Sequence, residues 1–61
     1  MTNFTLTADI TNTIMDAYDA GNGGYYGHND VAGFWNYCAD GFTGSVDDLI
    51  AMVVSDMHAN T

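Results

Sequence analysis

Residues 45–58, SVDDLIAMVVSDMH, carry the strongest structural signal in this chain. Apolar side chains recur there every three or four residues, which predicts a buried helix face made of Val46, Leu49, Ile50, Val53 and Met57. Ser45 fits the N-cap, and Asp48 follows three residues later in a weaker form of the capping box. Asp47 and Asp48 also stand in the first turn, where the helix dipole favours negative charge. The stretch therefore predicts a helix over residues 46–58.

A second helix is predicted over residues 8–20. Thr7 fits its N-cap, and Gly21 fits the position just beyond its C-terminal end. Helical spacing predicts an apolar face made of Ile10, Ile14, Ala17 and Tyr18.

A third helix is predicted over residues 30–40, capped by Asn29 or Asp30 and ended by Gly41. Its apolar stripe has the spacing i, i+3, i+4, i+7 and consists of Val31, Phe34, Trp35 and Cys38.

The linking segment 21–29, GNGGYYGHN, has four glycines within seven residues, which is typical of a loop. The expected fold is all-α: a compact three-helix domain with this Gly-rich loop, and residues 1–61 form a single small acidic domain. Tyr25 and Tyr26 also suit an extended segment, so an α+β fold with a short hairpin within residues 24–43 remains an alternative.

Eight aspartates, with no glutamate, lysine or arginine, give the chain a formal net charge of −8. The carboxylates have no Lys or Arg to pair with inside the chain, and their mutual repulsion destabilises the folded state. Such a surface repels nucleic-acid phosphates and anionic lipid headgroups, so we expect no direct binding to nucleic acid or membrane. The charge instead favours a partner with a basic surface.

Cysteine content and length set two further expectations. The single cysteine, Cys38, excludes an intramolecular disulfide and fits a reducing compartment, and no secretory signal is visible, so we expect a cytoplasmic protein. A chain of 61 residues buries only ~60% of its unfolded surface, and a homodimer would add to that burial.

Asp19 to Asp30 spans twelve residues between two predicted helices, the length of an EF-hand calcium loop. Gly24 matches the turn glycine of such a loop, but Gly21 and Gly23 stand where two side-chain oxygen ligands belong. A degenerate calcium-binding module is therefore only an alternative. A flexible glycine loop between two capped helices explains the segment better.

No other residues predict catalysis or a bound cofactor. His28, Cys38 and His58 lack the spacing of zinc ligands, and Cys38 has no electropositive neighbour in sequence to activate its thiol. We expect a non-enzymatic protein with no catalytic residues, no metal site and no cofactor.

The aspartates of the first helix lie on the side opposite much of its apolar face. At 1.5 Å rise per residue, Asp9 and Asp16 are about 10 Å apart and Asp16 and Asp19 about 4.5 Å. Duplex DNA carries one charge per ~1.7 Å of its axis. A row of carboxylates therefore presents to a basic groove a pattern of negative charge that resembles the DNA phosphates. Asp40 and Asp56 stand near helix C-terminal ends, where the dipole disfavours negative charge and an external partner is the better explanation.

Exposed aromatic residues offer a second hypothesis, a small helical protein–protein interaction module that binds through Tyr25, Tyr26 or Tyr37. Aromatic anchors and carboxylates together make up the predicted partner-binding set, which is Asp9, Asp16, Asp19, Asp40, Asp56, Tyr25 and Tyr26.

Small size, strong negative charge, absence of basic residues and an aromatic core together resemble the DNA-mimic inhibitors of phages and mobile elements. Short acidic anti-CRISPR proteins are the most similar in character. The resemblance covers composition across the whole chain and no sequence motif. It implies an inhibitor that competes with nucleic acid for the positively charged groove of a host defence complex, such as a CRISPR effector, in the cytoplasm of an infected bacterium.

Overall fold

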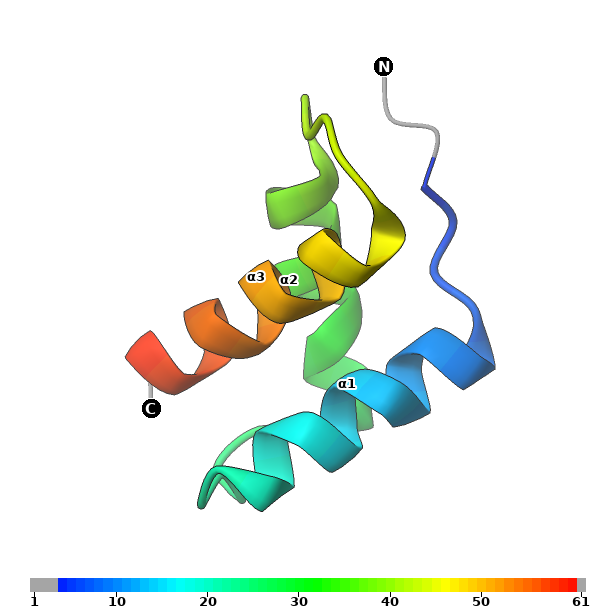
Figure 1. Cartoon of the computed structure of the whole chain (residues 1–61). Helices are drawn as coiled ribbons and strands as arrows, with labels where there is room; N and C mark the ends of the chain where they lie inside the picture. The colour runs from blue at the N-terminus through cyan, green and yellow to red at the C-terminus, as the bar shows by residue number, and fades with distance from the viewer. Residues whose placement is uncertain (1–3, 61) are drawn as a thin grey trace.

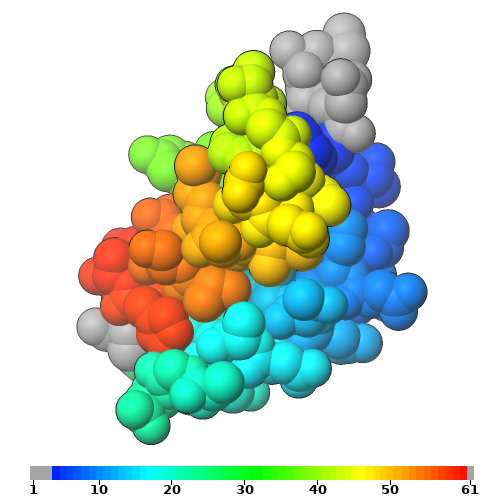
Figure 2. All heavy atoms as spheres, viewed as in Figure 1, coloured from blue at the N-terminus to red at the C-terminus, as the bar shows by residue number. Residues whose placement is uncertain are grey.

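The computed structural model describes residues 4–60 and contains three helices: α1 (Ala8–Ala20), α2 (His28–Ala39) and α3 (Val46–Ala59). In Figure 1, α1 and α3 lie side by side and α2 crosses behind them. Each helix contacts the other two. Figure 2 shows α1, in blue to cyan, and α3, in yellow to red, meeting along a continuous seam. The prediction of an all-α, three-helix domain is confirmed.

The predicted caps of α1 and α3 are present. The Thr7 hydroxyl accepts the Ile10 N–H at 3.2 Å, and the Ser45 hydroxyl accepts the Asp48 N–H at 3.1 Å. Each bond satisfies one backbone donor that the first helical turn leaves unpaired. The sequence places both helix starts correctly because the capping interaction involves residues only three positions apart.

The start of α2 differs from the prediction. The helix begins at His28 after the N-cap Gly27, and not at residue 30 after Asn29 or Asp30. Asp30 instead occupies the third helical position, where its Oδ2 accepts the Gly27 N–H at 2.9 Å. The carboxylate reaches back one turn, so the helix gains two residues and the loop shortens.

No strand occurs within residues 4–60, and Tyr25 and Tyr26 lie in the loop before α2. The hairpin alternative over residues 24–43 was therefore wrong. Packing of the helical stripe around Trp35 outweighs the preference of Tyr25 and Tyr26 for an extended conformation.

The C-terminal end of α1 forms a Schellman motif. The Asn22 N–H donates to the Asp19 carbonyl at 3.1 Å, and the Gly23 N–H donates to the Tyr18 carbonyl at 3.0 Å. The residue in the left-handed conformation is Asn22, with φ 65°, and not Gly21, whose φ is −93°. Our placement of Gly21 at that position was one residue early. Asn tolerates this conformation better than most non-glycine residues.

A type II turn ends α2. Asp40 has φ −64° and ψ 112°, Gly41 has φ 73°, and the Phe42 N–H donates to the Ala39 carbonyl at 3.1 Å. The turn directs the chain toward the N-terminal segment, where the rings of Phe42 and Phe4 meet edge to face at 5.7 Å.

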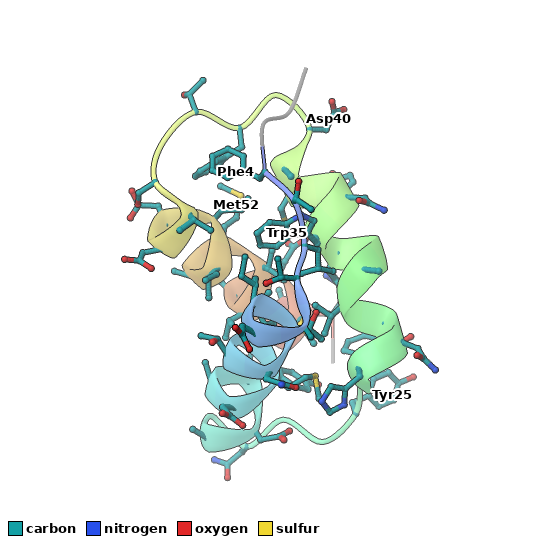
Figure 3. The ribbon with its side chains drawn as sticks, turned by 90° about the vertical axis from the view of Figure 1, so that its right-hand side faces the viewer. Phe4, Tyr25, Trp35, Asp40 and Met52 are labelled. Carbon is teal, nitrogen blue, oxygen red and sulfur yellow. The ribbon has the colours of Figure 1, made fainter. Side chains whose placement is uncertain are left out.

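The core lies between the three helices, and Trp35 points from α2 into it (Figure 3). Its buried side chains are Ile14, Met15, Tyr18, Val31, Trp35, Cys38, Ala39, Leu49, Val53 and Met57.

Five predicted core positions need correction. Ala17 and Val46 are exposed, and Ile10, Phe34 and Ile50 are only half-buried. Ala17 lies about 100° from Tyr18 around the helix axis, outside the stripe that contacts the other helices. Val46 is the first residue of α3 and lies at the edge of the packed region.

Within residues 4–60, no helix combines the length and the apolar character needed to cross a bilayer.

Gly23 and Gly33 make a matched pair for testing this packing. A Cβ at Gly23 would lie 2.6 Å from the Tyr18 ring and carbonyl, whereas a Cβ at Gly33 would meet no atom within 4 Å. We expect Gly23→Ala to lower the free energy of unfolding by about 1–3 kcal/mol, because the Tyr18 contact has no room for a methyl group. Gly33→Ala should raise it by up to about 1 kcal/mol through helix propensity.

Urea denaturation followed by circular dichroism measures both changes. Equal effects of the two substitutions would contradict the close approach of Gly23 to Tyr18.

Candidate functional site

The aspartates form an exposed acidic surface. Seven of the eight are exposed, and Asp56 alone is half-buried. Asp9, Asp16 and Asp19 all lie on α1. Asp9 and Asp16 are on the side opposite the buried Tyr18, whereas Asp19 follows the buried Met15 by one turn and lies at the edge of the packed face.

Asp40 and Tyr25 lie far from each other. Tyr25 precedes α2 and Asp40 follows it, and Figure 3 shows them at opposite ends of that helix. Twelve residues of α-helix span about 18 Å. The predicted partner-binding residues therefore do not form one compact site, and the α1 row (Asp9, Asp16 and Asp19) is the part that lies on a single helix.

Asp56 has a local role in the structure. Its Oδ2 accepts a hydrogen bond from the Cys38 thiol, with Sγ and Oδ2 3.7 Å apart. Burial raises the pKa of the Cys38 thiol, and the Asp56 charge and hydrogen bond raise it further. Asp56 thus links α3 to α2. This contact partly explains why a carboxylate occurs at this position, without an external partner.

Tyr26, in the loop before α2, is held by hydrogen bonds to Tyr18 of α1 and to Asn60 at the end of α3. Tyr26 donates its hydroxyl to the Asn60 carbonyl at 2.7 Å, and its N–H donates to the Tyr18 hydroxyl at 3.4 Å. Its ring meets Tyr25 and Phe34 edge to face, with centroids 4.8 and 4.9 Å apart. Partial burial raises the pKa of the Tyr26 phenol, with smaller contributions from Tyr25, Tyr18 and Asp30.

A shallow depression on the outer side of α2 is a feature that our partner-binding prediction missed. It has a volume of about 240 Å³ and is lined by Asp30, Gly33, Phe34 and Tyr37. We call it the α2 pocket. The signal was present in the sequence, because positions 30, 33, 34 and 37 follow helical spacing on a face next to the buried stripe. Phe34 was assigned to the core, which concealed that pattern.

Metal ligation has little support from the geometry. Among residues 4–60, no three His, Cys or Asp side chains lie close enough together to hold a metal ion. Asp19 and Asp30, the ends of the calcium-loop alternative, lie within α1 and α2, and Asp30 accepts the Gly27 N–H.

Comparison with known protein families, with curated proteins and with solved structures finds no match to this chain. The site must therefore be interpreted from its own residues.

The contact between Cys38 and Asp56 predicts the reactivity of the thiol. We expect alkylation by iodoacetamide near neutral pH to be slow, because burial and the Asp56 charge both disfavour the reactive thiolate. Asp56→Asn removes the charge, so the pKa of Cys38 should fall and the rate–pH profile should move to lower pH. Asp40→Asn is the matched control and should leave the profile unchanged; an identical profile for both variants would refute the pairing.

The helix dipoles predict opposite effects of two other charges on stability. Asp19 is in the last turn of α1 and Asp47 in the first turn of α3. Asp19→Asn should raise the free energy of unfolding by about 0.3–1 kcal/mol at low salt, and Asp47→Asn should lower it by a similar amount. Thermal denaturation at low and high salt measures this difference, which should shrink as salt screens it. If both substitutions stabilise the fold equally, general repulsion and not the dipole is the cause.

Proposed function

We propose that this protein is a non-enzymatic inhibitor that occupies the positively charged, nucleic-acid-binding surface of a host defence complex. The observation that supports it best is the exposure of seven aspartates in a chain with no lysine or arginine. These carboxylates repel one another, and a basic partner would convert that repulsion into attraction.

The α1 row is the surface that we propose for this contact. Asp19 lies in the last turn of α1, where the dipole makes a carboxylate unfavourable for stability, and Asp16 lies about one turn before it. Their presence there is explained by an outside cation better than by the fold. Their spacing along one helix face suits a groove that normally holds a phosphate backbone.

A CRISPR effector is the first partner to test, because its guide and target strands lie in a positively charged channel. The inhibitor would act in the cytoplasm, where such complexes operate. Long-range attraction would speed its encounter with the channel, and salt would weaken it.

The test is competition with target DNA for a guide-loaded CRISPR effector at several ionic strengths. We expect the protein to displace the DNA at low salt and to lose affinity steeply as salt rises. Asp16→Asn with Asp19→Asn should weaken binding about five- to thirtyfold, which corresponds to roughly 1–2 kcal/mol for two exposed ion pairs.

The matched control is the double change Asp47→Asn with Asp48→Asn, which removes the same charge from α3. A smaller loss of affinity for this control would support α1 as the contact surface. An equal loss would mean that net charge alone drives binding, and binding that is insensitive to salt would contradict the proposal.

A further inference from the structure

The α2 pocket combines two aromatic side chains with a carboxylate. Phe34 and Tyr37 lie one turn apart on α2, and Asp30 is one turn before Phe34. A Cβ at Gly33 would meet no atom within 4 Å, so the pocket stays open at that point. Tyr37 is 79% exposed, which leaves its ring accessible from solvent.

This combination suits a cationic side chain. A guanidinium group binds the face of an aromatic ring through cation–π attraction and pairs with a carboxylate through its N–H groups. Its planar shape allows both contacts at once, whereas a lysine ammonium is a compact, strongly hydrated charge. A volume of about 240 Å³ is below the ~300–1,000 Å³ of pockets that hold drug-sized ligands, and so fits a single side chain better.

Two of the side chains that line the pocket, Phe34 and Asp30, are also held in place by contacts within the chain. The Phe34 ring meets Tyr26 edge to face at 4.9 Å, and Tyr26 is hydrogen-bonded to the Asn60 carbonyl near the end of α3. The carboxylate of Asp30 is oriented by the Gly27 N–H. Binding therefore requires little ordering of Phe34 and Asp30, which lowers its entropic cost.

We propose that the α2 pocket receives an arginine side chain from the basic partner protein. The net charge of −8 favours a cationic occupant and opposes a second copy of this chain, which would carry the same charge. This inference rests on the proposed function only in taking the partner to be a protein with a basic surface. It adds the residue type that the partner must present.

The test is an NMR titration of the full chain at low salt with N-acetyl-arginine amide, N-acetyl-lysine amide and neutral N-acetyl-citrulline amide. We expect the arginine probe to shift the amide signals of Gly33, Phe34 and Tyr37 and to bind more tightly than the other two. Tyr37→Leu should weaken arginine binding about two- to fivefold, the range of an exposed cation–π contact. Asp30→Asn should weaken it by a similar factor and still accept the Gly27 N–H through its side-chain oxygen.

Two control variants isolate the pocket. Tyr25→Leu removes an exposed tyrosine outside the pocket lining, and Asp47→Asn removes one negative charge from α3; both should leave arginine binding within twofold. Equal shifts with lysine, shifts spread over the whole acidic surface, or no effect of Tyr37→Leu would overturn the arginine site. Signals at Gly33 and Tyr37 that move with protein concentration alone would assign the pocket to self-association and would also overturn it.

The competition assay with the effector separates this inference from the proposed function. If Tyr37→Leu leaves inhibition intact while the α1 substitutions abolish it, the proposed function stands and the arginine site fails. If the probe binds at the α2 pocket but the protein does not displace DNA from any basic complex, the arginine site stands and the proposed function fails.

Discussion

Apolar packing between the three helices, centred on Trp35 and Tyr18, is the interaction on which the rest of the structure depends. The chain has no lysine or arginine, so no ion pair with those residues offsets the repulsion among its eight aspartates. Burial of Trp35, Tyr18, Leu49 and their neighbours must exceed both that repulsion and the loss of chain entropy. The close contact of Gly23 with the Tyr18 ring shows how little space this small core leaves.

The repulsion among the aspartates also bears on where these residues lie. The Asp30 carboxylate accepts the Gly27 N–H at the start of α2, Asp48 lies in the first turn of α3, where the helix dipole favours its charge, and Asp56 accepts a hydrogen bond from the Cys38 thiol. These contacts recover some of the free energy that the negative charge costs. Asp16 and Asp19 are exposed on α1, and we propose that a partner outside the chain offsets their cost.

Two surfaces of different chemistry follow from this division. The α1 row offers three negative charges along one helix, which favours rapid and salt-sensitive encounter with a basic surface. The α2 pocket offers a shaped aromatic contact beside one carboxylate, which selects among cationic side chains. A partner that engages both would gain attraction from the first and specificity from the second.

The sequence by itself determined the three helices, their caps at Thr7 and Ser45, and the acidic face of α1. Each of these depends on residues a few positions apart, so local spacing is sufficient. The sequence misplaced the start of α2, because Gly27 gave no capping signal and the reach of the Asp30 carboxylate was not anticipated.

Only the tertiary structure decided the rest. Phe34 and Val46 have the same apolar character as their buried neighbours, and only the positions of the other helices leave both partly exposed. The hydrogen bond between Cys38 and Asp56 joins residues eighteen positions apart in the sequence. The hydrogen bond between Tyr26 and Asn60 joins residues thirty-four positions apart. Such contacts form only when the helices pack. Helical periodicity specifies which residues share a face of one helix, but it does not specify which residues of the other helices that face contacts.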